Sequence, residues 1–489
     1  MALTGTTLRR AFTLGLITGA VYFTGTLYWI SGVMALYGDM ALWVAVLINA
    51  GLVAYQAVYT AIFALIVRRI VLAHGPPALM AAPVVWVATE LGRTHILTGF
   101  PWVLLGYSQA TDLPIAQLAS LFGVYGVSML VASVSAALAV WAVSNARPRA
   151  VPPLRSWRVG TDRYTPLVMV LAVVTGVAVW GSHRAAVGEW THAGEPIRVG
   201  LIQGNIDQNE KIEAGRAGAI FQEYMRMTRQ AIREGAEFVL WPESSTPFRF
   251  EDDLPAAAQI RVLAQQARVT LLFGSDQFVR GAPGAETRFY NAAFLVRPDG
   301  TTGGVYRKMH LVPFGEYVPV KKLLFFAAPL VQAVSDFSAG DEAALLPVGN
   351  HLVSTAICYE VVYPDLVRRF VAGGSEMLTT ITNDAWFGPT SAPYQHFEQA
   401  SMRAIEEGRY LVRSANTGIS GIVDPYGRVL ARSAIFEPAV VVGEARFLRT
   451  STFYARHGDV LPYASVLATA ALLLWARRRA HTARPPIAV

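Results

Sequence analysis

Five long runs of uncharged, mostly apolar residues constrain this chain more than any other feature. They cover residues 11–30, 41–67, 115–143, 165–182 and 460–476. A bilayer core about 30 Å thick is crossed by about 20 apolar residues in a helix, so each run predicts a transmembrane helix. Composition agrees, because 53% hydrophobic against 15% charged residues is too apolar for a wholly soluble protein. A buried helix of a soluble domain is the alternative for each run.

A shorter apolar run, residues 76–89, ends at Glu90, and we count it as a sixth span that continues past this carboxylate or enters the membrane obliquely. Basic residues favour the cytoplasmic side of short loops. With the N-terminus inside, six spans place thirteen arginines inside and only Arg93 in the outside loops before the fifth span. The formal charge of +7 is then an orientation signal rather than evidence of nucleic-acid binding.

The same topology exports the residues between the fifth and sixth spans. Short apolar runs recur there at 197–202, 238–241, 269–273, 292–296, 351–357 and 377–381, with helix-like stretches at 218–234 and 256–267. Strands that alternate with helices predict an α/β layered domain. We therefore expect a membrane domain with five transmembrane helices over residues 1–182, a linker over 183–195, the α/β domain over 196–450, and a C-terminal transmembrane helix with a basic cytoplasmic tail over 451–489.

Several catalytic motifs are absent from the sequence. It contains no H-E-x-x-H, C-x-x-C, G-x-S-x-G or Walker-type glycine loop. A zinc protease, a dithiol oxidoreductase, an ordinary serine esterase and a P-loop ATPase all lose support. The single cysteine also excludes a disulfide within the chain.

That cysteine, Cys358, follows the apolar run 351–357, where a buried strand would emerge at the edge of a sheet. This is a good position for a nucleophile, but a lone cysteine is also commonly a small buried hydrophobe. A free thiol has a pKa of about 8.5 and needs a nearby cation or base to react at neutral pH. The candidate partners are therefore what decides the question.

Two other segments offer such partners. Glu243 follows an apolar run and Pro242, which places it near the edge of the sheet, although a helix cap or a surface charge would look the same. The segment 306–319, Y-R-K-M-H-L-V-P-F-G-E-Y-V-P, sets Lys308 and Glu316 among prolines and aromatic residues. Such a loop is stiff and partly buried, and its lysine could hold a thiolate or an oxyanion by charge.

The order W-P-E at 241–243, the segment 306–319 and I-C-Y-E at 357–360 resembles the Glu/Lys/Cys triad of the nitrilase superfamily, and the wording resembles the apolipoprotein N-acyltransferase family. Further matches are T-N-D-A-W-F-G at 382–388, R-Y-L-V-R-S-A-N-T-G at 409–418, G-F-P-W at 99–102 and G-Y-S-Q at 106–109. The resemblance implies a membrane bundle of about six helices plus an exported nitrilase-like α-β-β-α sandwich. Members usually have eight membrane helices, so the spans here would correspond to the third through the eighth.

The resemblance also implies a reaction. Cys358 would take a fatty acyl group from a membrane phospholipid as a thioester and pass it to the N-terminal α-amine of an S-diacylglyceryl-cysteine apolipoprotein, the last step of lipoprotein maturation. Glu243 would be the general base, and Lys308 would stabilise the oxyanion and bias the thiol toward thiolate. Glu316 and Glu360 would support them, or pair with local cations. We expect no cofactor and no nucleic-acid partner, and a multi-pass monomer of the bacterial cytoplasmic (inner) membrane with its catalytic domain in the periplasm.

Acyl transfer must outcompete hydrolysis of the thioester, which predicts an apolar, substrate-binding wall around the nucleophile. The candidates are Trp102, Phe314, Tyr317, Tyr359, Asn383, Trp386 and Phe387. The aromatic residues among them suit a core or an interface anchor equally well. His310 and His396 lack the spacing of metal ligands, so we expect neither a metal site nor a Cys/His pair.

Two other functions remain open from the residues alone. A membrane-tethered amidase or nitrilase could use the same triad, although a simple hydrolase needs only a tether and not the motifs of the membrane half. A membrane scaffold or transporter with an accessory exported domain is the third possibility. The few intramembrane charges besides Glu90 and Arg93 weaken a transport pathway.

Overall fold

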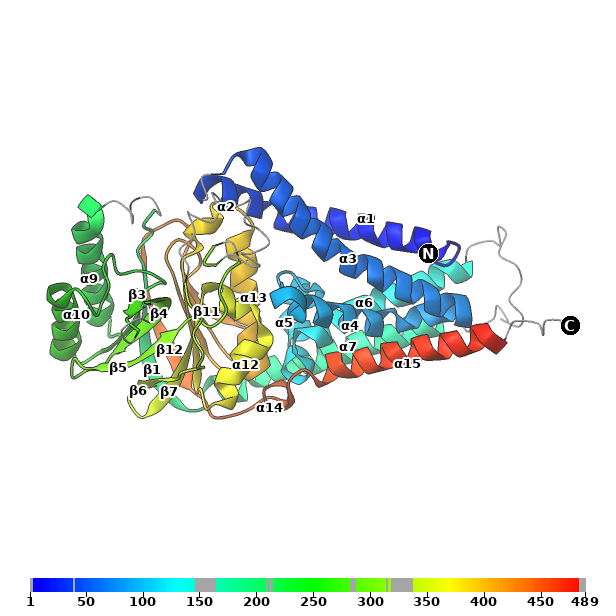
Figure 1. Ribbon diagram of the computed structural model, residues 1–489. Helices are drawn as coiled ribbons and strands as arrows, with labels where there is room; N and C mark the ends of the chain where they lie inside the picture. Colours follow the sequence, from blue (N-terminus) through cyan, green and yellow to red (C-terminus); the bar gives the residue numbers. More distant parts are fainter. Residues whose placement is uncertain are drawn as a thin grey trace, which may run out of the picture. The chain divides into compact units, whose positions relative to one another are not determined.

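The computed structural model describes residues 3–37, 40–145, 164–207, 210, 214–281, 287–313, 315–317 and 337–482 (Figure 1). Its contacts group into two compact units. The helical unit comprises Met1–Ser31, Trp43–Val187 and His457–Val489, and the α/β unit comprises Gly32–Leu42 and Gly188–Arg456. The short segment Gly32–Leu42 therefore belongs with the α/β unit, although it follows the first apolar run.

In the described part of the chain, four helices are long and apolar enough to cross a membrane. They are α3 (Leu42–His74), α6 (Ala119–Asn145), α7 (Thr165–Val187) and α15 (Val460–Thr482). A fifth span results if α1 (Leu8–Leu27) and α2 (Trp29–Tyr37), which are bent by 51°, count as one. These helices carry the five apolar runs of the sequence.

The sixth predicted span is a different kind of segment. Residues 76–89 fall on the 3₁₀ helix η1 (Pro76–Ala81) and on α4 (Ala82–His95), which does continue past Glu90. At 14 residues α4 is shorter than the roughly 20 residues that a full crossing needs. The count of six spans thus stays a prediction.

The α/β unit contains two six-stranded sheets. The first sheet has the order β12 (Ala439–Phe447), β1 (Glu195–Gln203), β2 (Phe238–Leu240), β3 (Thr270–Val279), β4 (Arg288–Val296) and β5 (Thr302–Arg307). The second has the order β11 (Val429–Arg432), β10 (Gly421–Val423), β9 (Leu411–Ala415), β8 (Met377–Thr382), β7 (His351–Ile357) and β6 (Leu346–Val348). All six apolar runs predicted as strands in this region are strands.

Helices cover the outer face of each sheet and complete an α-β-β-α sandwich (Figure 1). Helices α9 (Ala217–Arg233) and α10 (Leu254–Ala267) pack on the first sheet, and α12 (Pro364–Ala372) and α13 (Ala392–Glu407) pack on the second. On α9, Ile220, Tyr224 and Met227 recur at helical spacing and are buried against the core around Trp241. This amphipathic pattern explains why the predicted helix 218–234 forms here.

The centre of each sheet is parallel, and this places the candidate site. Strands β1, β2 and β3 run in one direction, as do β7, β8 and β9. Because the carboxyl ends of parallel strands meet at one edge, the residues that follow them can converge there. Glu243 follows β2, Cys358 follows β7 and Asn383 follows β8.

Candidate active site

Glu243 is held by three donors just beyond strand β2. Pro242 cannot donate a ladder hydrogen bond, so regular pairing ends before the carboxylate. One oxygen of Glu243 accepts from Asn291 Nδ2 at 2.7 Å and from Lys308 Nζ at 3.3 Å. The other accepts from the main-chain N–H of Asn383 at 2.9 Å. The side chain is buried, so these bonds fix its orientation.

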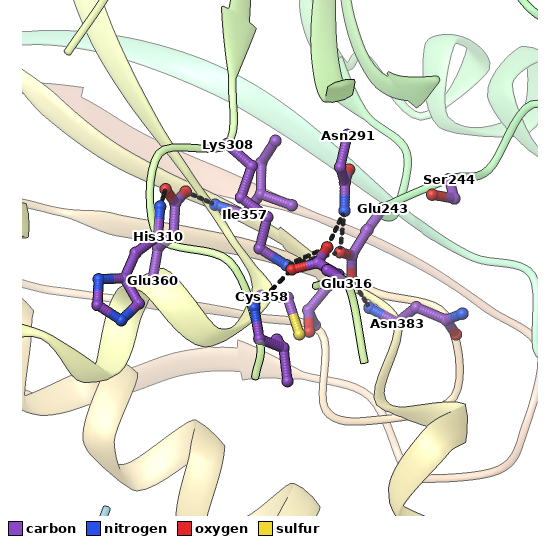
Figure 2. Close-up of polar contacts among 12 residues, drawn as sticks. Glu243, Ser244, Asn291, Lys308, His310, Glu316, Ile357, Cys358, Glu360 and Asn383 are labelled. Atoms are coloured by element: carbon purple, nitrogen blue, oxygen red, sulfur yellow. Dashed lines mark hydrogen bonds and ion pairs between the residues drawn. The ribbon is translucent and has the colours of Figure 1, made fainter. Parts of the chain in front are cut away.

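Lys308 lies at the end of β5 and is 1% exposed. Its Nζ donates to Glu316 Oε1 at 2.8 Å as well as to Glu243, as Figure 2 shows. Burial lowers the pKa of Lys308, but the two carboxylates raise it more, so the net shift is upward. The side chain therefore stays a cation at neutral pH.

Cys358 is the first residue after β7 and has a φ of +52°. This left-handed conformation costs a residue with a Cβ about 1–2 kcal/mol. The turn takes the thiol out of the alternating pattern of the strand. In Figure 2 the sulfur of Cys358 points toward the carboxylate of Glu243 and the ammonium of Lys308.

The thiol of Cys358 is neutral at rest. Burial raises its pKa first, Glu243 raises it further, and the opposing effect of Lys308 is smaller. The expected bias of Lys308 toward thiolate exists but is outweighed. The carboxylates of Glu243 and Glu316 and the ammonium of Lys308 together carry one net negative charge. A free thiolate would add a second negative charge to the site. Transfer of the thiol proton to Glu243 avoids that cost, because it leaves the total charge unchanged.

Asn291 on β4 joins the two carboxylates. Its Nδ2 donates to Glu243 and, at 2.9 Å, to Glu316 Oε1, so both acids share the same two donors, Asn291 and Lys308. The second oxygen of Glu316 accepts from the main-chain N–H of Val312 at 2.8 Å. Glu316 thus contacts Lys308 directly, as the sequence analysis allowed.

Glu360 connects the turn that bears the nucleophile to the loop that bears Lys308. Its fully buried carboxylate accepts four hydrogen bonds, and Figure 2 labels two of the donor residues, Ile357 and His310. The donors are the N–H groups of Ile357 (2.8 Å), Met309 (2.7 Å) and His310 (3.0 Å) and the hydroxyl of Tyr306 (2.8 Å). Burial raises the pKa of Glu360 to about 7 although these bonds favour the ionised form. These bonds tie the turn at Cys358 to the loop that bears Lys308.

The side chain of His396 contacts the main chain of Cys358. Its Nε2 lies 3.1 Å from the carbonyl oxygen of Cys358, which can only accept, so Nε2 carries a hydrogen. Its Nδ1 lies 3.0 Å from Asp384 Oδ1, and Asp384 Oδ2 accepts from Arg413 at 2.9 Å. All three side chains are fully buried. This cluster braces the strained turn at Cys358.

The same cluster keeps the carboxylate of Asp384 ionised. Burial raises the pKa of Asp384, but Arg413 and His396 lower it more, so the carboxylate stays ionised. In the described residues no group of three or more His, Cys, Asp or Glu side chains has the arrangement of a metal site.

The predicted substrate-binding residues are placed as follows. Tyr359 is buried, and its hydroxyl accepts from Tyr363 at 2.9 Å. Trp386 and Phe387 are half-buried on the 3₁₀ turn η9 (Asp384–Phe387), and Tyr317 is half-buried in the segment that follows Lys308. The side chain of Asn383 is held by Asn416 at 2.9 Å.

Trp102 lies in the helical unit, where it is 1% exposed and packs on Trp29 with ring centroids 5.2 Å apart. Phe314 lies outside the described residues. Substrate contact by any of these residues stays a prediction.

Asn291, Asp384 and Arg413 belong to these networks but were not predicted as site residues from the sequence. For Asn291 and Arg413 a signal was present. Asn291 directly precedes the apolar run 292–296, and Arg413 interrupts the apolar strand β9. Polar groups inside a buried strand need partners, which marks such positions as parts of a network.

Comparisons with known proteins agree with this fold. The family model for carbon-nitrogen hydrolase matches residues 198–450, and the model for the apolipoprotein N-acyltransferase N-terminal domain matches residues 1–137. The α/β unit is therefore a nitrilase-like carbon-nitrogen hydrolase domain, in a chain that also carries apolar helices suited to a membrane.

Relatives identify the family within that class. An apolipoprotein N-acyltransferase from Geobacter metallireducens is 40% identical over 473 residues, which cover 96% of this chain and 88% of that protein. One from Methylococcus capsulatus is 33% identical over 96% of this chain and 88% of its own length. The chain belongs to the apolipoprotein N-acyltransferase family, as its motifs predicted.

Among solved structures, a mutant of the Nesterenkonia AN1 amidase from the nitrilase superfamily aligns with a TM-score of 0.40 and 19% identity, over 55% of this chain and 95% of that one.

Proposed function

We propose that this chain transfers a fatty acyl group from a membrane phospholipid, through a thioester on Cys358, to the N-terminal α-amine of an S-diacylglyceryl-cysteine apolipoprotein. The observation that carries the proposal is the buried Glu243–Lys308 pair beside Cys358, in a chain whose two halves match both parts of an acyltransferase family. Glu243, Lys308 and Cys358 are the proposed catalytic residues, with Glu316 and Glu360 in support.

The first half-reaction forms the thioester. Glu243 removes the proton of the neutral thiol as the sulfur attacks the ester carbonyl of the phospholipid. Lys308 stabilises the oxyanion of the tetrahedral intermediate, because a buried cation acts there without solvent screening. When the intermediate collapses, the protonated Glu243 gives its proton to the departing lysophospholipid oxygen.

The second half-reaction reverses these roles. An α-amine has a pKa of about 7.7–8.0, so part of it is neutral near pH 7 and can attack the thioester carbonyl. Glu243 takes a proton from the attacking amine, Lys308 again holds the oxyanion, and Cys358 leaves as sulfur that recovers a proton from Glu243. The products are an amide and the free enzyme.

The location of the reaction is part of the proposal. The six-span topology places the α/β unit on the periplasmic side of the inner membrane of a bacterium, over the domain ranges 1–182, 183–195, 196–450 and 451–489. Tyr317, Tyr359, Trp386 and Phe387 supply apolar surface near the thioester that disfavours water. We propose that the chain acts as a monomer.

Hydrolysis of a small carbon-nitrogen substrate by the same triad is less favoured. The match of residues 1–137 to the acyltransferase N-terminal domain concerns a part of the chain that a tethered amidase does not need.

A product assay separates the two functions. Full-length protein in detergent is incubated with phospholipid labelled in its acyl chain and with a synthetic peptide that begins with S-diacylglyceryl-cysteine. We expect labelled amide on the peptide, and neither product nor labelled protein with Cys358→Ala. Labelled free fatty acid without amide would contradict acyl transfer to an amine.

A further inference from the structure

A cavity of about 460 Å³ lies in the α/β unit away from the candidate active site. Four arginines line it, Arg368, Arg409, Arg449 and Arg456, together with one carboxylate, Glu376. Glu376 precedes strand β8 and Asn383 follows it. At about 3.3 Å per residue the strand separates the cavity from the active-site edge of the sheet by about 20 Å.

Carboxylates neutralise only a part of this charge. Glu376 pairs with Arg449 at 3.1 Å and also with His351 at 2.6 Å. In the described part of the chain Arg368, Arg409 and Arg456 have no carboxylate within ion-pair distance. Their contacts are main-chain carbonyls, which orient a guanidinium but do not cancel its charge.

The individual contacts show how the arginines are held. Arg409 is 4% exposed, and its Nε donates to the carbonyl of Ser375 at 2.9 Å. Arg368 Nη2 donates to the carbonyl of Arg456 at 3.2 Å. The Nε of Arg456 donates to the carbonyl of Thr452 at 3.3 Å. These three guanidinium groups are thereby oriented by main-chain oxygens rather than by ion pairs.

A second buried acid, Glu407, does not supply the missing charge. Glu407 interacts electrostatically with Arg409 and Arg368, but burial, and next Glu406, raise its pKa to about 8. Near pH 7 this carboxyl is therefore mostly protonated. Arg449 and Arg456 are exposed, whereas Arg409 is buried and Arg368 is half-buried. Like charges gathered on the wall of one cavity repel each other, so the arrangement favours an anion there.

The chemistry of arginine and the course of the chain identify the anion. A guanidinium matches the oxygens of a phosphate with paired hydrogen bonds. Arg456 stands four residues before Val460, where the candidate membrane span α15 begins. Four residues reach at most about 14 Å, so this arginine lies within that distance of the first residue of the candidate span.

We propose that this cavity binds the phosphate of an anionic phospholipid headgroup, such as that of phosphatidylglycerol. The lipid would be a bound ligand and not the acyl donor, because the cavity is about one strand length from Cys358. The bound lipid would hold the end of the second sheet at which β8 begins against the lipid surface. This inference does not depend on the reaction proposed above.

Native mass spectrometry of the full-length protein in detergent tests the site. Dioctanoyl phosphatidylglycerol and dioctanoyl phosphatidylcholine are titrated separately, and bound lipid is counted. We expect at least a tenfold preference for phosphatidylglycerol in the wild type, and loss of that preference in the double variant Arg449→Gln/Arg456→Gln. The matched control is Arg229→Gln/Arg233→Gln, which removes the same charge from exposed positions on α9 and should keep the preference.

Further arms make the result decisive. Arg449→Lys/Arg456→Lys keeps the charge without the paired geometry and should retain part of the preference, which also guards against misfolding of the glutamine variant. Equal binding of the two lipids by the wild type, or an unchanged preference in the glutamine variant, would overturn the proposal. Displacement of the lipid by inorganic phosphate at a similar concentration would assign the cavity to free phosphate and overturn the lipid assignment. Acylation of Cys358 is measured separately in the same samples. Failure of the proposed reaction can therefore be distinguished from failure of lipid binding in the cavity.

Discussion

Replacement of Glu360 by glutamine tests whether the connection between the two catalytic loops matters. One carboxylate oxygen accepts from Tyr306, Met309 and His310, and the other accepts from Ile357. A carboxamide turns one of these acceptors into a donor. With the amide oxygen facing the three donors, its NH₂ group would face the N–H of Ile357, and one buried donor on each side would lose its partner.

The magnitude follows from these four contacts. A buried donor left without a partner costs about 1–3 kcal/mol, and each remaining bond weakens because its acceptor is no longer charged. We expect Glu360→Gln to lower the free energy of unfolding by about 3 kcal/mol. If a similar energy is lost from the placement of Lys308 relative to Cys358, thioester formation slows by about 100-fold, since each 1.36 kcal/mol is tenfold in rate.

The assay is single-turnover acylation of the protein by labelled phospholipid, with thermal unfolding measured in parallel. Glu407→Gln is the matched control, because Glu407 is also fully buried, and it has a pKa of about 8 that makes its carboxyl already mostly neutral. Acid should mimic the effect of the Glu360 substitution on the rate but not on stability, because a pKa that is raised in the folded state makes protonation favour folding as pH falls. As pH falls through about 7 the protonated fraction of Glu360 grows and the wild-type rate should drop, whereas the glutamine variant should not show this step. Acylation by Glu360→Gln at the wild-type rate would refute the reasoning.

Three further predictions follow from the same contacts. Since burial and Glu243 raise the pKa of Cys358, its alkylation by iodoacetamide should still accelerate well above pH 8.5, and Glu243→Gln should move the rise to lower pH; a plateau below pH 8 would show that the thiolate is already formed. His396→Ala should reduce kcat by about 10–100-fold with little change in KM, while His396→Gln, which can still donate to the carbonyl of Cys358, should recover part of it; equal kcat for the two variants would exclude a positioning role. Asn291→Ala should lower kcat/KM by about tenfold and Asn291→Asp by more, because the second change sets a third carboxylate beside Glu243 and Glu316; the reverse order would exclude a charge-balancing role.

Local sequence patterns predicted much of the fold. The apolar runs that became β1, β2, β7 and β8 are short and bounded by polar residues or glycine, and period and length were sufficient to recognise them. The resemblance in the order of the motifs likewise grouped Glu243, Lys308 and Cys358 as one triad, although the first two follow strands of the first sheet and Cys358 follows a strand of the second.

Other features depend on contacts that no local pattern contains. The segment Gly32–Leu42 groups with the α/β unit, where the hydroxyl of Tyr37 donates to the carbonyl of Ala385 at 2.9 Å and its ring meets Trp386 at 5.0 Å. In the sequence this segment lies mostly between the first two apolar runs, and no local pattern indicates which unit it joins. The protonation of Cys358 was equally out of reach, because it depends on the balance between burial, Glu243 and Lys308 in three dimensions.

The most direct test of the central claim is to locate the acyl group on the protein. Full-length enzyme is incubated with labelled phospholipid without acceptor, digested, and mapped by mass spectrometry. The account predicts one acyl group on the peptide that contains Cys358, released by neutral hydroxylamine as expected of a thioester and absent after Cys358→Ala. Label on a serine, threonine or lysine instead, or undiminished transfer by Cys358→Ala, would contradict it.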